Sequence, residues 1–239
     1  MKVEELHFEF KRRWDKQANN HRKGFTDVEI DQTLNSAVNE YMYIFGTGRN
    51  PKNYDVGFEV NQQMIDMLQT LVVSYPETGT INSIDVDSNI DYANLPNDYR
   101  YFVSAFAVDP ICGDVGITIE QHGDLSSVLK NFHRKANRKF RNIPGTIRAN
   151  KLYMYHNGVF DIQSVKLTYI KDPAKICIGT YTEIPTAENP NPPTKPKQEC
   201  DLPVDYHDIL VDIAVQETSR IYLNTNRYQL GKDKLNDIT

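Results

Sequence analysis

Paired cysteines and long apolar runs are both missing from this 239-residue chain, and no signal peptide is expected. Its three cysteines, Cys112, Cys177 and Cys200, stand far apart without a CxxC spacing, which favours a reducing compartment over a disulfide scaffold. No stretch reaches the ~18 apolar residues of a membrane helix, and the first residues lack the apolar part of a signal peptide. We therefore expect a protein that is made and used in a cytosol, or in a particle assembled there, without a membrane.

Signature motifs of common enzyme classes are missing as well. The chain contains no GxxxxGK[ST] loop, no GxSxG elbow and no HxxxH pair. Gly46 and Gly48 follow a predicted helix and lack a third glycine, so they are no dinucleotide fingerprint. We expect no catalytic residue, no metal and no cofactor. Two distant carboxylates brought together by folding would still make a small enzyme, which stays open as an alternative.

An acidic segment near residue 85 matches a calcium loop only at its start. Asp85, Asp87 and Asn89 have the spacing of the first ligands. Ile90 then stands where glycine is required, and Pro96 stands where a bidentate glutamate is required. An acidic turn is the simpler interpretation.

His207 lies between Asp205 and Asp208, close to a predicted helix start. Acidic residues are favoured there because they complement the helix dipole. A metal or catalytic site is the alternative interpretation of this cluster.

Helical periodicity marks both ends of the chain. The first predicted helix repeats an apolar residue every three or four positions: Val3, Leu6, Phe10 and Trp14. A second helix begins with a capping box of Thr26 and Glu29 and stops at Gly46. A third helix is expected at about 59–72, and a last one from near Pro203 to about 224.

The middle of the chain is rich in β-branched and aromatic residues, which predicts strands at 78–84, 99–108, 111–121 and 176–181. Asn157 and Gly158 favour a tight turn, so 152–155 and 165–170 are predicted to form a hairpin. Asp124 is a candidate N-cap for a short helix that continues through Leu129.

The order of these elements predicts an α+β fold. A helical bundle formed by 1–75 and 200–225 would carry an inserted β-rich module, 76–184. The segment 185–199 contains five prolines and is expected to be an extended arm, because proline lacks the N–H that helices and central strands use. A polar tail, 226–239, would follow the last helix.

Charge is unevenly distributed along the chain, whose net charge is −5. No acidic residue occurs between Asp124 and Asp161, and Phe132, His133 and Phe140 are interleaved with basic residues there. Three interpretations stay open: contact with nucleic-acid phosphates, docking on an acidic face of another subunit, or a solvated basic loop. The candidate contact residues are Lys130, Arg134, Lys135, Arg138, Lys139, Arg141, Arg148 and Lys151.

Short motifs at both ends and in the middle resemble one family. The segment 29–37, with Glu-Ile-Asp followed by Leu-Asn and Ala, resembles the capped helix of tailed-bacteriophage head–tail connector proteins. The Leu-Pro at 202–203, the histidine at 207 and the following Ile-Leu-Val-Asp resemble their last helix. The segments 95–99, 150–155 and 165–173 are similar to the inserted module in ring proteins of crAss-like phages.

This resemblance implies a structural virion protein without enzymatic activity. Such adaptor proteins form a homo-oligomeric ring, commonly a dodecamer, beneath the portal at one capsid vertex. The ring joins the portal to other tail proteins and extends the channel through which DNA passes without specific binding. A nucleic-acid-binding module that uses 130–151 stays open as an alternative function.

Overall fold

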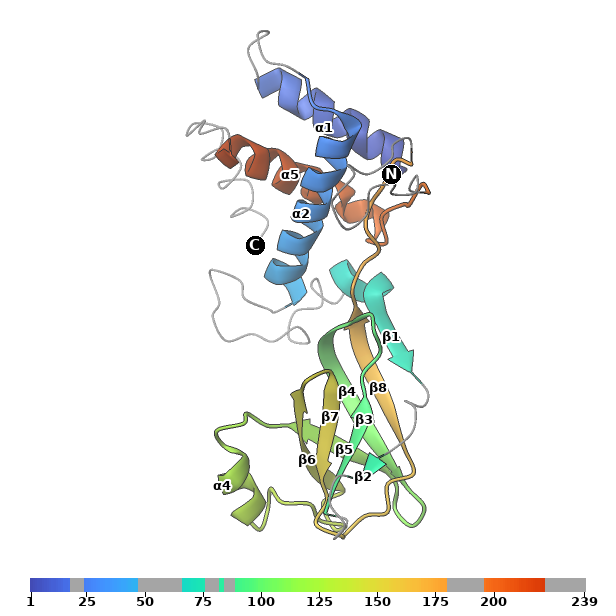
Figure 1. Cartoon of the computed structure of the whole chain (residues 1–239), viewed down its shortest axis with the longest axis vertical. Helices are drawn as coiled ribbons and strands as arrows, with labels where there is room; N and C mark the ends of the chain where they lie inside the picture. The colour runs from blue at the N-terminus through green and yellow to red at the C-terminus, as the bar shows by residue number, and fades with distance from the viewer. Residues whose placement is uncertain (18–23, 47–65, 76–81, 84–88, 180–195, 222–239) are drawn as a thin grey trace, which may run out of the picture. The chain divides into compact units, whose positions relative to one another are not determined.

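The computed structural model describes residues 1–17, 24–46, 66–75, 82–83, 89–179 and 196–221 (Figure 1). The chain divides into two compact units, one comprising Met1–Leu71 with Pro173–Thr239 and the other Val72–Asp172. The first, the helical unit, is built from both ends of the chain, and the second, the β unit, is inserted between them. The predicted α+β class is therefore confirmed.

The bounds of the inserted unit differ from the predicted limits of 76 and 184. Val72 already pairs with Ile170 in the sheet, so the β unit begins before residue 76. At the other end, the backbone of Ile176 is hydrogen-bonded to Asn35 in the helical unit. The sequence pattern did not reveal either attachment, because both join segments far apart in the chain.

Three helices make the core of the helical unit: α1 (Val3–Gln17), α2 (Asp27–Gly46) and α5 (His207–Ile221). They pack against one another through the apolar stripes that the periodicity predicted. Phe10 and Trp14 of α1 both make edge contacts with Phe25, which precedes α2. The fully buried side chains of this core include Leu6, Phe10, Ile30, Leu34, Tyr41 and Phe45.

The capping box at the start of α2 is confirmed. The Thr26 N–H donates to Glu29 Oε2 over 2.8 Å, and the Glu29 N–H donates to Thr26 Oγ1 over 3.3 Å. Each side chain thus satisfies a backbone donor that the first helical turn leaves unpaired.

Two helix predictions require correction. In the third predicted helix, 66–68 are helical, Gln69–Leu71 form the 3-10 turn η2, and Val72 begins a strand. Pro203 is not the first residue of α5, because the 3-10 turn η3 (Val204–Tyr206) separates them.

The β unit is one sheet with the strand order β1-β8-β4-β5-β6-β7-β3-β2. Its inner side is lined by apolar residues from most strands, with Ile143, Met154, Val165 and Leu167 among the most buried. The strands are β1 (Val72–Tyr75), β2 (Asn82–Ser83), β3 (Ile90–Asn94), β4 (Tyr99–Asp109), β5 (Gly113–Ile119), β6 (Asn142–Arg148), β7 (Lys151–Tyr155) and β8 (Ser164–Lys171).

The parallel pairing of β5 with β6 explains the long connection that carries most of the basic residues. Two parallel neighbours need a crossover, because the chain must return to the same end of the sheet. The return passes through α4 (Leu125–Lys130), which is set beside β6 in Figure 1. Asp124 is the N-cap residue of α4, which confirms the predicted position, but its side chain makes no capping hydrogen bond.

The predicted hairpin of 152–155 with 165–170 is wrong. β7 pairs with β6 and β3, whereas β8 pairs with β1 and β4. Asn157 and Gly158 do adopt positive φ angles of 50° and 67°, but the turn leads into a loop. The tight hairpin joins β6 to β7 through Ala149 and Asn150, whose φ angles are 48° and 57°.

Several predictions fall partly or wholly outside the described residues. These are Asp85 and Asp87 of the calcium-like segment, the first half of the third helix, most of the strand 78–84, most of the Pro-rich arm, and the tail 226–239. Within the expected strand 176–181, Cys177 forms an isolated bridge with Gln198.

Candidate functional site

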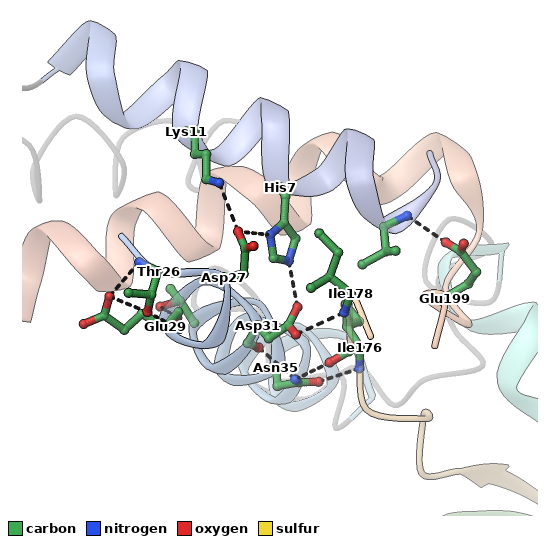
Figure 2. A network of polar contacts seen from close by, with 12 residues as sticks. His7, Lys11, Thr26, Asp27, Glu29, Asp31, Asn35, Ile176, Ile178 and Glu199 are labelled. Carbon is green, nitrogen blue, oxygen red and sulfur yellow. Dashed lines mark hydrogen bonds and ion pairs between the residues drawn. The ribbon is translucent and has the colours of Figure 1, made fainter. Parts of the chain in front are cut away.

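The most connected polar site in the helical unit is a clamp on α2 that holds the returning chain (Figure 2). We call His7, Asp31, Asn35 and the backbone of 176–178 the polar clamp. Asp31 and Asn35 are four residues apart and therefore lie on the same face of the helix. Both residues belong to the segment 29–37, on which the predicted resemblance to connector proteins partly rests.

Asp31 is the buried centre of the polar clamp, with 1% of its surface exposed. Its Oδ1 lies 2.7 Å from His7 Nε2, and its Oδ2 accepts the Ile178 N–H over 3.1 Å. Asn35 fixes both polar groups of one residue: its Oδ1 accepts the Ile176 N–H over 2.8 Å, and its Nδ2 donates to the Ile176 carbonyl over 2.9 Å. The side chains of the clamp thus make the hydrogen bonds to Ile176 and Ile178 that a neighbouring strand would otherwise make.

His7 joins α1 to the polar clamp in a geometry unlike that of a catalytic dyad. Its Nδ1 faces Asp27 Oδ1 at 3.7 Å, so carboxylates lie near both ring nitrogens. Activation of a nucleophile requires a hydroxyl or thiol within hydrogen-bond reach of the imidazole. Among the described residues, no hydroxyl or thiol makes a hydrogen bond with His7. The His7–Asp31 contact connects α1 to α2.

The cluster around His207 also connects distant segments. His207 Nε2 donates to the Leu202 carbonyl, and its Nδ1 lies 2.9 Å from the Met1 amine. Burial lowers the pKa of His207 below 6.5, and this effect outweighs the hydrogen bond to Leu202. Asp208 forms an ion pair with Arg13 of α1. Arg13 Nη1 also lies 2.9 Å from Asp212 Oδ1.

In the β unit, Asp109 holds two loops at one end of the sheet. Its carboxylate accepts the N–H groups of Ile111, Cys112 and Asp161 over 2.8–3.1 Å. Desolvation opposes ionisation of this buried carboxyl, but the three N–H donors hold its pKa below 3.8. A second buried pair, His156 with Asp91, has 3.3 Å between Nε2 and Oδ2.

The described residues contain no group of three or more His, Cys, Asp or Glu side chains arranged to hold a metal ion. None of the described helices is long and apolar enough to cross a lipid bilayer. Cys112, Cys177 and Cys200 are free thiols, and burial raises the pKa of Cys200 to about 11.

The structure divides the predicted basic segment between the two ends of β6. Arg141 precedes the strand and Arg148 ends it, which separates them by about 20 Å at the rise of an extended chain. Arg148 lies over the Tyr153 ring and Lys151 over the Tyr92 ring, at 4.2 and 4.1 Å from the ring centroids. These two cations thus lie over the neighbouring rings of Tyr153 and Tyr92, close to the β6–β7 turn.

The other six basic residues occur in α4 and the loop that follows it. Residues 131–141 form what we call the aromatic–basic lobe. Arg134 pairs with Glu120 at 2.6 Å, and Arg138 Nε donates to the Val159 carbonyl over 2.8 Å. Lys135 lies over the Phe132 ring, 5.6 Å from its centroid. Half of these cations are thus engaged within the β unit.

Sequence reasoning missed the polar clamp and the hydrogen bonds by which Asp109 holds two loops. Asp31 and Asn35 stood within the motif that suggested the family, but no pattern indicated their partners at 176–178. The chain matches no family model, and no curated protein is similar to it.

Proposed function

We propose that this chain is a structural subunit of an oligomeric ring at the portal vertex of a tailed-phage virion. In this role it joins the capsid portal to the tail and lengthens the DNA channel. The observation that carries the proposal is the polar clamp. Asp31 and Asn35, two residues of the connector-like motif, bind the backbone of the chain that returns from the inserted unit.

The polar clamp supports a structural function because it fastens distant chain segments to each other, as a rigid ring subunit requires. A subunit with an inserted module must fix both chain crossings firmly to its helices. Here the second crossing is fastened by hydrogen bonds from one face of α2. The buried carboxylate of Asp31 and the partly buried amide of Asn35 therefore both have backbone partners.

The charge of the chain fits a DNA channel. A net charge of −5 disfavours adhesion of a polyanion that must pass through the ring. Ring closure needs contacts between different faces of neighbouring copies, because a heterologous interface can repeat until the rotation closes.

The test is assembly with a portal ring of a crAss-like phage, followed by mass photometry. The proposal predicts a complex whose mass exceeds that of the portal by many copies of this 27.5 kDa chain. A variant with Asn35→Ala and Asp31→Leu, which lacks the clamp, should bind in fewer copies. A chain that stays monomeric with the portal present would rule out the proposed function.

A second candidate function is binding of single-stranded nucleic acid by the aromatic–basic lobe. The observation that favours it is the contact of His133 with Phe132 and Phe140, at 5.3 and 5.8 Å between ring centroids, beside several cations. Bases stack on such rings while cations contact phosphates. Titration of fluorescent oligothymidine at low salt tests it, and no binding there excludes it.

A further inference from the structure

One end of the β unit exposes apolar side chains that a solvated surface does not need. We call this the distal end, and it is the end where β5, β6 and β8 begin. The chain enters the β unit at the opposite end, where β1 begins, and leaves it there, where β8 ends. Ile111 at the tip of the β4–β5 hairpin is 70% exposed, Phe132 61% and Phe140 45%. Phe132 and Phe140 both contact His133, and adjoining exposed apolar rings of this kind mark contact sites.

The two phenylalanines are exposed on an ordered loop. The Asn131 side chain accepts the His133 N–H over 2.9 Å, and the Asn137 side chain accepts the Lys139 N–H over 2.8 Å. Between these turns Ala136 is buried in the core of the sheet. A preformed loop loses little conformational freedom on binding, so the lobe is prepared for a partner.

The charges of the lobe suit a protein partner better than a phosphate backbone. A phosphate track requires a row of cations that are free to contact it. Arg134 and Arg138 are instead used to hold the lobe in place. Among the described residues, the side chains of Lys130, Lys139 and Arg141 have no hydrogen bond or ion pair, and they lie in the same stretch of chain as the exposed rings of Phe132 and Phe140. An apolar centre with a polar rim is the usual anatomy of a protein interface.

The complementary surface exists on the chain itself. The β unit, Val72–Asp172, contains eleven basic and eleven acidic residues, so its net charge is zero. The net charge of −5 therefore falls entirely on the helical unit. Within the β unit, the cations are concentrated between Asp124 and Asp161, where no acid occurs. The basic lobe of one copy and the acidic helical unit of another copy therefore attract each other.

We propose that the distal end of one copy, with Ile111 and the aromatic–basic lobe, docks on the acidic helical unit of a second copy. This inference rests on the proposed function, because it names the interface through which the ring would form. The two surfaces differ, so a docked pair still offers one free surface of each kind. Such a contact can repeat from copy to copy, and it gives a ring when the rotation between neighbours closes.

Two charge-reversal variants test the contact. The first carries Lys130→Glu and Lys139→Glu in the region of the lobe. The matched control carries Arg148→Glu and Lys151→Glu at the opposite end of β6. Mass photometry of wild type, alone and with portal, sets the reference. We expect the lobe variant to associate at least about tenfold more weakly, and the control to assemble like wild type. Circular dichroism must show that both variants are folded.

A second variant, Phe132→Ser with Phe140→Ser, removes apolar contact without changing charge. It is expected to weaken assembly by about tenfold as well. Zero-length carbodiimide cross-linking of a mixture of light and heavy-isotope chains then identifies the partner surface. The expected intermolecular links join Lys130 or Lys139 to Asp or Glu residues in 1–71 or 173–239.

The outcomes separate the inference from the proposed function. If the wild type forms rings and both lobe variants assemble normally, the proposed docking surface is wrong but the proposed ring stands. Cross-links that join the lobe only to the β unit would lead to the same conclusion. Lobe variants that assemble normally but lose oligothymidine binding assign the lobe to nucleic acid. A wild-type chain that is monomeric alone and with the portal overturns both proposals.

Discussion

The carboxylate of Asp31 accepts hydrogen bonds from residues 24 and 147 positions away in the sequence. Asn35, one turn further along α2, saturates both backbone groups of Ile176. A buried backbone group that loses its partner keeps its desolvation cost. Asp31 and Asn35 are therefore important because they satisfy backbone groups of 176–178. A contact with another molecule is not needed to explain this importance.

Asn35→Ala tests the polar clamp. It removes both hydrogen bonds to Ile176, and we expect the free energy of unfolding to fall by about 1–3 kcal/mol. Urea denaturation followed by circular dichroism measures it. The control is Gln32→Ala at an exposed neighbouring position of α2, with an expected change within about 0.5 kcal/mol. Equal effects of the two substitutions would remove the special role of Asn35.

His207 predicts a pH dependence with a defined sign. Its folded pKa lies below 6.5, so the unfolded chain binds this proton more readily than the folded protein. The stability contributed by the neutral ring is therefore complete above pH 6.5 and declines as the pH falls through that value. Urea midpoints measured between about pH 7.5 and about pH 5.5 should decrease less in His207→Gln than in wild type. Identical slopes would contradict this assignment.

At the scale of elements, the β6–β7 turn is the clearest local strain. Ala149 adopts a φ of 48°, where an L side chain with a Cβ is disfavoured. Ala149→Gly should raise the free energy of unfolding of the β unit by about 1 kcal/mol, because glycine adopts this conformation freely. Asn150→Ala, at φ 57°, should have the opposite sign. Thermal melts of both variants measure the difference, and a loss of stability in Ala149→Gly would contradict the argument.

The helices were predictable because their signals are local. Four apolar residues on α1 and the Thr26–Glu29 box are readable within a few positions. The hairpin was mispredicted because Asn157 and Gly158 provide a turn signal without determining which strands pair. Meanwhile Ala149 and Asn150 form the tight turn without the glycine that would have revealed it.

The candidate sites show the same limit. The basic residues formed one run in the sequence, but β6 lies within that run and separates Arg148 and Lys151 from the lobe. The extended conformation of β6, which pairs with both β5 and β7, determines this separation. The polar clamp depends on contacts across more than 140 residues, for which the sequence offers no periodic signal.

At the scale of the whole molecule, the distribution of charge predicts the response to salt. An interface between a basic lobe and an acidic unit weakens as ions screen it, and the Debye length falls from about 8 Å at 0.15 M to about 3 Å at 1 M. We therefore expect the assembled fraction, measured by mass photometry, to fall as NaCl rises. An assembly that strengthens with salt would indicate an interface dominated by apolar contact.

The central claim is that this chain builds a closed ring. Native mass spectrometry of the wild-type chain, alone and with a portal, tests it most directly, because it counts the copies in each particle. The account predicts one discrete mass, a whole number of 27.5 kDa chains, with the dodecamer as the expected size from the resemblance to connector proteins. A monomer under both conditions, or an open ladder of masses, would contradict it.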